Sequence, residues 1–143
     1  MNDDPKQMLL VTRIVWAAML AGQVLFMIVI PFIQPTEPTE NAAPQALLLL
    51  SFAMLVVLVP VGYYVRMQAY KANWRENIVT PGGYFVGNII LLAMCEGVAF
   101  MGLVNVHLRG ELFPALIPTI LALMVQIINF PNGRAMQPDP LDL

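Results

Sequence analysis

Charged residues are scarce in this 143-residue chain: they make up 11% of it, whereas hydrophobic residues make up 59%. Soluble domains carry roughly 25% charged and about 45–50% apolar residues. The composition therefore indicates an integral membrane protein, and the length allows a single domain, residues 1–143. Seven Lys and Arg residues and a net charge of −2 provide no basic stripe for nucleic acid. We expect the chain to contact membrane lipids and to bind no nucleic acid.

Side chains that bind metals or catalyse reactions are also few. Cys95 is the only cysteine, which excludes an internal disulfide and a cysteine-based metal cluster. His107 is the only histidine. It is a weak candidate for a metal ligand, for instance to a haem or chlorophyll of a neighbouring chain, and is otherwise an interfacial residue. The sequence has no Ser-His-Asp set, no glycine-rich phosphate loop and no paired carboxylates within one apolar run. We expect no enzyme activity and no cofactor bound by the chain alone.

Long apolar runs are what this sequence has in abundance. Four of them, 19 to 23 residues long, cover approximately residues 14–33, 46–65, 84–106 and 112–130. About 20 apolar residues in a helix cross a hydrocarbon core of roughly 30 Å, and lipid offers the backbone polar groups no other partner. The sequence therefore predicts an all-α fold, a four-helix transmembrane bundle, in which Pro118 kinks the last helix.

The positive charges divide unevenly between the connections. Arg109 stands alone on one side of the runs, and the other six of the seven Lys and Arg residues lie on the opposite side. These six are Lys6, Arg13, Arg66, Lys71, Arg75 and Arg134. Because cytoplasmic loops carry the excess of Lys and Arg, both termini are predicted to be cytoplasmic. We expect a multi-pass protein of the cell inner membrane.

The predicted cytoplasmic loop, residues 66–83, combines basic and aromatic residues. On a helix, Met67, Tyr70, Trp74 and Ile78 would share one face, and the segment either continues the second helix or lies in the membrane interface. Its candidates for a lipid or partner interface are Arg66, Tyr70, Lys71, Trp74 and Arg75.

The ends of the helices carry local signals. Thr80 is suited to cap the third helix, with Pro81 at its first position. The tail, residues 131–143, is rich in Pro and Asp and is expected to be disordered unless a partner binds it.

Glu96 is the only charged residue in the run 84–106 and lies near its centre. A charge at the bilayer centre costs at least about 2.5 kcal/mol, so an intramembrane acid is a candidate functional residue. Desolvation without a Lys or Arg at that depth favours the neutral acid, which both donates and accepts hydrogen bonds. Gln23 and Gln126 are its possible polar partners. The alternatives are a carboxylate that carries a proton or a cation, and a contact with another subunit or with lipid.

Small residues surround Glu96 on the same predicted helix. Ala93 and Gly97 form a small-xxx-small pair, and Gly102 is a further position for close helix packing. The segment reads Ala-Met-Cys-Glu-Gly-Val-Ala-Phe-Met-Gly-Leu over residues 93–103. It resembles the carboxylate helix of the rotary-ATPase proteolipids, the c-ring subunits, which has the pattern Ala-x-x-Glu-x-x-Ala-x-x-Gly-Leu. The resemblance implies that Glu96 is an ion-carrying carboxylate. The chain departs from that family in placing this segment on the third of four helices.

These observations favour a non-catalytic accessory or scaffold subunit of a larger membrane complex, for example a photosynthetic or respiratory one. Such a subunit would pack through the Glu96 helix and the aromatic-basic cytoplasmic loop, with other membrane subunits as partners. The alternative is a proton- or cation-translocating homo-oligomer that uses Glu96. A lipid- or quinone-binding helix bundle is a third possibility.

Overall fold

The computed structural model describes residues 4–33 and 43–137. Its α-helices are α1 (Pro5–Val29), α2 (Ala43–Ala72), α3 (Pro81–Arg109) and α4 (Leu116–Ile128). Two short 3-10 helices are η1 (Ile30–Ile33), which continues α1, and η2 (Arg134–Met136), which follows α4. A small antiparallel hairpin of β1 (Trp74–Arg75) and β2 (Ile78–Val79) joins α2 to α3. The predicted helical class with four helices is confirmed.

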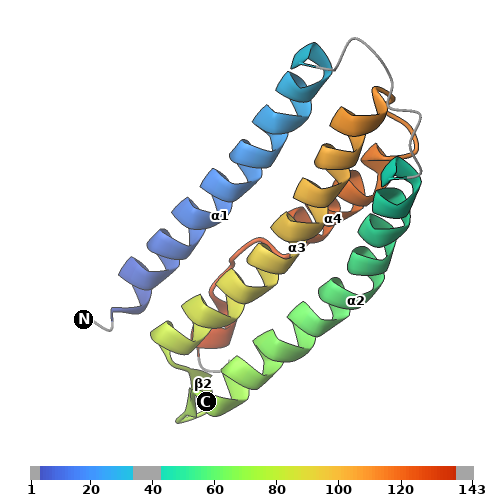
Figure 1. Ribbon diagram of the computed structural model, residues 1–143. Helices are drawn as coiled ribbons and strands as arrows, with labels where there is room; N and C mark the ends of the chain where they lie inside the picture. The colour runs from blue at the N-terminus through green and yellow to red at the C-terminus, as the bar shows by residue number, and fades with distance from the viewer. Residues whose placement is uncertain (1–3, 34–42, 138–143) are drawn as a thin grey trace.

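The central helix of this fold is α3. It packs against α1, α2 and α4, with α1 and α2 on opposite sides of it (Figure 1). In the most apolar stretch of each long helix, 50% of the residues of α3 are buried, whereas only 11% of those of α1 and of α2 are buried. The core follows from this arrangement: Leu91, Cys95 and Ala99 of α3 pack against Ala122 of α4.

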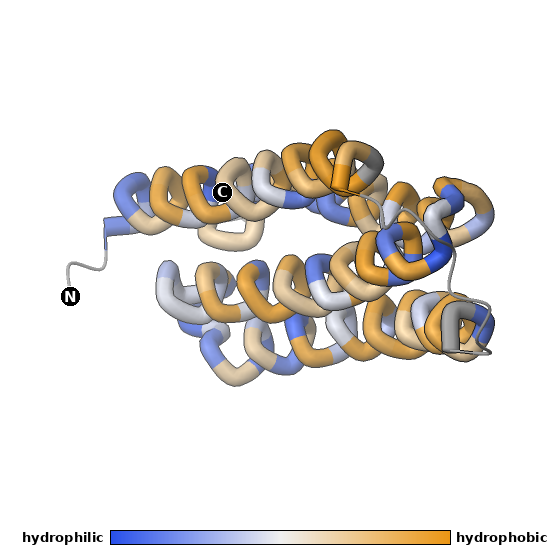
Figure 2. The backbone as a smooth tube through the Cα atoms, turned by 45° about the horizontal axis from the view of Figure 1, so that its top comes forward, coloured by the Kyte–Doolittle hydropathy of each residue, from blue (hydrophilic) through white to orange (hydrophobic). Residues whose placement is uncertain are grey.

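Three of the helices, α1, α2 and α3, are long and apolar enough to cross a membrane. Apolar residues run along most of each of them (Figure 2). Their outward faces expose large hydrophobic side chains, among them Leu49 and Val56 of α2, which are 71% and 70% exposed. Exposed apolar surface of this extent suits contact with lipid or with another protein. These features are those of a membrane protein.

The long helices extend beyond the predicted apolar runs. α1 begins at Pro5, because Asp4 caps it by accepting a hydrogen bond from the backbone N–H of Lys6 at 3.0 Å. α2 continues to Ala72, so the first part of the predicted loop 66–83 is helical. The predicted start of α3 is confirmed: Thr80 is the N-cap, Pro81 is the first helical residue, and the Thr80 hydroxyl accepts from Gly83 N at 3.3 Å.

The predicted fourth helix is present, but it is shorter than the apolar run 112–130. α4 has 13 residues, which at 1.5 Å per residue cover only about 20 Å. It begins at Leu116, so Pro118 lies in its first turn, where the missing N–H removes no helical hydrogen bond. The predicted kink at Pro118 is therefore wrong, because this proline does not lie in the helix interior.

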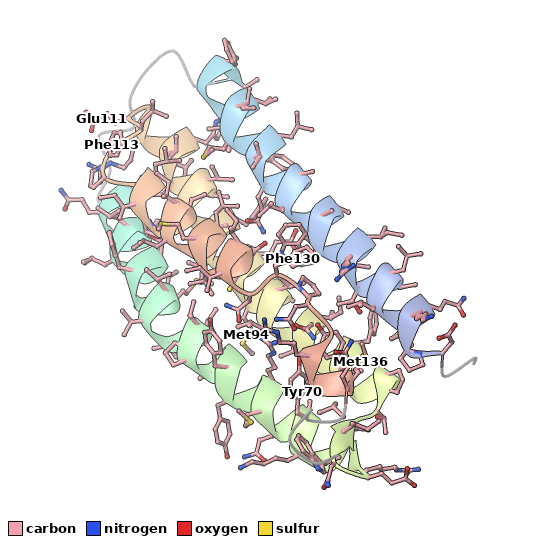
Figure 3. The ribbon with its side chains drawn as sticks, turned by 180° about the vertical axis from the view of Figure 1, so that it is seen from behind. Tyr70, Met94, Glu111, Phe113, Phe130 and Met136 are labelled. Atoms are coloured by element: carbon pink, nitrogen blue, oxygen red, sulfur yellow. The ribbon has the colours of Figure 1, made fainter. Side chains whose placement is uncertain are left out.

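After α4 the chain returns to the hairpin end of the bundle as a largely non-helical segment, residues 129–137. The 3-10 helix η2 in this segment contacts β2 and α3. Met136 is 6% exposed and packs with Val79 and Tyr84, close to Tyr70 (Figure 3). The expectation of a disordered tail is thus wrong for residues 131–137, because the chain itself packs against them. Residues 138–143 lie outside the described part.

The charged residues gather at the two ends of the bundle. Arg109 ends α3, at the end opposite the hairpin, and forms an ion pair with Glu111 at 3.8 Å. Figure 3 labels Glu111 at this end of the bundle. The six other basic residues are in the N-terminal half of α1, the last two turns of α2, the hairpin and η2, at the hairpin end. The structure therefore keeps the uneven division of positive charge that the sequence predicts.

Candidate functional site

Glu96 lies in the middle of α3, 15 residues after Pro81 and 13 before Arg109 (96 − 81 and 109 − 96). Its half-buried side chain lines a cavity of about 190 Å³ between α1 and α3. The lining residues are Gly22, Gln23 and Phe26 of α1 with Glu96, Phe100 and Leu103 of α3. The candidate site is therefore a glutamate and a glutamine that line one partly open, mostly apolar cavity.

The cavity exists because α1 has a glycine where a side chain would fill it. A Cβ atom built at Gly22 would meet no other atom within 4 Å. Phe26 and Phe100 pack edge to face across the two helices, with their ring centroids 6.4 Å apart. They are 52% and 55% exposed, so the cavity lies at the outer surface of the bundle.

Gln23 and Gln126 bond to each other and not to Glu96. Gln126 Nε2 donates to Gln23 Oε1 at 3.0 Å, and the two residues are 0% and 4% exposed. This contact leaves Gln23 Nε2 and Gln126 Oε1 buried without a partner in the described part of the chain. Within residues 4–33 and 43–137, no hydrogen bond or ion pair reaches the Glu96 carboxyl. The predicted bonds from Glu96 to either glutamine are therefore absent.

The physical reason is the rotation of α3. Its Cys95 and Ala99 face Ala122 of α4, and successive residues of a helix are turned by about 100°. Glu96 is consequently directed away from α4, where Gln126 lies, and towards α1. Gln23 reaches both directions: its oxygen bonds to Gln126, while the residue also lines the cavity beside Glu96.

The small residues near Glu96 divide into two groups. Gly102 makes the predicted close contact, because a Cβ there would overlap Thr119 Oγ1 and lie 3.1 Å from Ala115 O. Ala93 and Gly97 make no close packing contact with the other described residues, 4–33 and 43–137. Ala93 is exposed, and a Cβ at Gly97 would have no other atom within 4 Å. The pair expected to pack a neighbouring helix is thus open on the outer surface, beside Glu96.

A second polar cluster stabilises the segment after α4. Trp16 Nε1 donates to Gln126 O at 2.9 Å, and Arg13 Nε donates to Pro131 O at 3.0 Å. Gly133 N donates to the Tyr84 hydroxyl at 3.0 Å. Buried non-helical backbone must find its hydrogen bonds inside the protein. These side chains supply them, and the sequence patterns of single helices gave no signal of this role.

Arg66 and Tyr70 belong to this internal cluster. Arg66 Nη1 donates to Asn129 Oδ1 at 2.8 Å, and Arg66 Nε donates to the Tyr70 hydroxyl at 3.1 Å. The same hydroxyl accepts from Asn88 Nδ2 at 2.8 Å, and the Tyr70 ring stacks on Tyr84 at 5.9 Å. Arg66 and Tyr70 are therefore hydrogen-bonded within the chain, although both also remain partly exposed at its surface.

The single aromatic face predicted for residues 66–78 does not form. α2 ends at Ala72, so Trp74 and Ile78 lie on the hairpin and not on the helix that carries Tyr70. Lys71, Trp74 and Arg75 are exposed, and they remain candidates for contact with lipid or a partner.

His107 is half-buried near the end of α3, and its Nδ1 has no partner in the described part of the chain. No group of three or more His, Cys, Asp or Glu side chains within residues 4–33 and 43–137 could hold a metal ion. A metal at His107 would therefore need ligands from elsewhere.

No protein-family model matches the chain, and comparison with curated proteins and with solved structures finds no significant similarity. The likeness of residues 93–103 to a proteolipid helix stays a prediction.

Proposed function

We propose that the chain is a non-catalytic accessory subunit of a larger membrane complex. In this proposal both termini of the chain lie on the cytoplasmic side of the inner membrane. One observation carries the proposal: Glu96 lies in mid-helix on the outer surface, without a partner in the described residues, beside the open small residues Ala93 and Gly97. An unpaired carboxyl group in hydrocarbon is costly, and small residues let a second helix approach closely. A docked helix would cover this face and supply the missing hydrogen bond.

The orientation rests on the six basic residues at the hairpin end, because the side with excess Lys and Arg stays in the cytoplasm. Arg75 and Glu111 are exposed at opposite ends of the bundle and provide the test. Single cysteines at these positions, in a Cys95→Ala background, are labelled with an impermeant maleimide in intact cells. We expect Glu111→Cys to be labelled and Arg75→Cys to be protected until the cells are opened. The reverse pattern would show that the orientation is inverted.

The docking face is tested by a bulky residue at its centre. Ala93→Ile should remove the protein from its complex, because the side chain would hold a partner helix away from α3. Ala53→Ile is the matched control, since Ala53 is likewise exposed but lies on α2. The measurement is mass spectrometry of the proteins that co-purify from native membranes. Equal recovery of neighbours with both variants would show that no partner docks at Ala93.

A second function, a proton- or cation-translocating homo-oligomer, is favoured by the outward position of Glu96 and its proximity to Gln23 in one cavity. Proton flux into proteoliposomes of the purified protein separates the two functions. Flux that Glu96→Gln abolishes would establish transport, whereas an accessory subunit gives no flux with either side chain.

A further inference from the structure

We propose that an exposed patch at the hairpin end of α2 binds the headgroup of an anionic phospholipid. This basic-aromatic patch consists of Tyr64, Met67, Lys71, Trp74 and Arg75. α2 lies across α3 from α1, so the patch is separate from the cavity beside Glu96 (Figure 1). The inference goes beyond the proposed role in assembly and requires only that α2 lies in a membrane.

The patch continues an exposed face that runs along most of α2. Exposed residues recur there every three or four positions, which is the spacing of one helix face. They are Leu49, Ala53, Val56, Pro60, Tyr64, Met67 and Lys71. Along this face the chemistry changes from apolar to aromatic and then to basic. A bilayer imposes this order, because Tyr and Trp gather at the interface and Lys and Arg attract anionic headgroups beyond it.

The level at which the chemistry changes fits the thickness of a bilayer. Tyr64 lies 21 residues after Ala43, where α2 begins (64 − 43). At 1.5 Å per residue this distance is about 32 Å, and the hydrocarbon core is roughly 30 Å thick. Lys71 lies about 10 Å further along the axis, where its long side chain reaches the headgroup phosphates. Trp74 follows on the hairpin, exposed as an interfacial anchor is.

The charges of the patch match an anion. Lys71 and Arg75 are exposed, and neither forms an ion pair within residues 4–33 and 43–137. Glu76, which is also exposed, is one acid beside these two cations. The nearby Arg66 donates its hydrogen bonds to neutral side chains and adds a further positive charge. An anionic phosphodiester supplies the missing negative charge, whereas a zwitterionic headgroup has no net charge to supply.

Native mass spectrometry of the purified full chain tests the proposal. The chain in nonionic detergent receives equal amounts of phosphatidylglycerol and phosphatidylcholine with the same acyl chains. A cation beside an anionic lipid surface contributes roughly fivefold to binding, so we expect phosphatidylglycerol to be preferred by about tenfold or more. The double variant Lys71→Gln with Arg75→Gln should lose most of this preference. No preference in the original chain, or a preference that the double variant retains, would overturn the proposal.

The matched control removes the same charge at the same end of the bundle. Lys6→Gln with Arg134→Gln changes two exposed basic residues outside the patch, so this variant should keep most of the preference. Equal losses in the two double variants would show that the lipid responds to total charge and not to the patch. Glycerol phosphate, a soluble headgroup without acyl chains, should not displace the lipid at equal concentration. Displacement would indicate a site for a soluble anion and would contradict the assignment to lipid.

Photo-crosslinking separates lipid from a protein partner at the same patch. Met67 is 54% exposed, and benzoylphenylalanine replaces it in native membranes. We expect lipid adducts from position 67, and a discrete adduct with a protein would refute the assignment to lipid. These outcomes are independent of assembly through Ala93, because the patch lies on α2 and the docking face on α3.

Discussion

Replacement of Gly102 by alanine tests the packing of α4 on α3 at a single methyl group. The added Cβ would overlap Thr119 Oγ1 and lie 3.1 Å from the Ala115 carbonyl oxygen. Thr119 is 0% exposed and donates to Ala99 O at 2.9 Å, so its hydroxyl cannot move away without losing that hydrogen bond. Gly97→Ala is the matched control, because it adds the same methyl to the same helix in open space.

The magnitude follows from three contributions. Each Gly→Ala change gains about 1 kcal/mol from helix propensity, which cancels in the comparison. Overpacking at Gly102 costs about 1–3 kcal/mol. Displacement of the Thr119 hydroxyl costs about 0.5–1.5 kcal/mol more. We therefore expect the Gly102→Ala protein to be about 2–4 kcal/mol less stable than the Gly97→Ala protein.

The assay is reversible unfolding in mixed micelles with increasing denaturing detergent, followed by circular dichroism. Adding Thr119→Ala to Gly102→Ala removes the overlapping oxygen, so the double variant should regain part of the lost stability, a coupling that only residues in contact show. Equal stability of the two glycine variants, or no recovery in the double variant, would refute the packing of α4 described above.

Two further predictions use the same unfolding assay. Tyr84→Phe should lower the unfolding free energy by about 1–3 kcal/mol, because the buried N–H of Gly133 loses its acceptor. Tyr64→Phe, at an exposed tyrosine, is the control and should have little effect. Equal losses in the two variants would show that the Tyr84 contact is unimportant. Pro118→Ala should change stability by less than about 1 kcal/mol, since a proline in the first turn removes no helical bond; a gain approaching about 3 kcal/mol would show that Pro118 lies in a helix interior.

The sequence predicts the helical class, the cap at Thr80 and the gathering of basic residues at one end, because each depends on local composition. It does not predict the length of α4. The run 112–130 is uniformly apolar, so hydropathy treats it as one span, whereas the helix begins at Leu116 and ends at Ile128. The non-helical return that follows depends on a hydrogen bond donated by Arg13 and on one accepted by the Tyr84 hydroxyl, and both residues are distant in sequence.

The sequence predicts the position of Glu96 along its helix, but not the direction in which its side chain points. The position of Glu96 at mid-helix follows from counting residues along α3. Which polar group it faces depends on how α3 is rotated between its neighbours, and this rotation is set by contacts such as Cys95 with Ala122. The pairing of Gln23 with Gln126, and the cavity beside Gly22, arise from that tertiary arrangement.

The most direct test of the proposed function is photo-crosslinking from the Glu96 face in native membranes. Phe100 lies one turn from Glu96 and is 55% exposed, so the additional benzoyl group of benzoylphenylalanine at this position can extend outward. Val56, 70% exposed on α2, is the control position. We predict one discrete adduct with a different membrane protein from position 100 and mainly lipid adducts from position 56. Lipid adducts alone from position 100, or an adduct only with a second copy of this chain, would contradict the account.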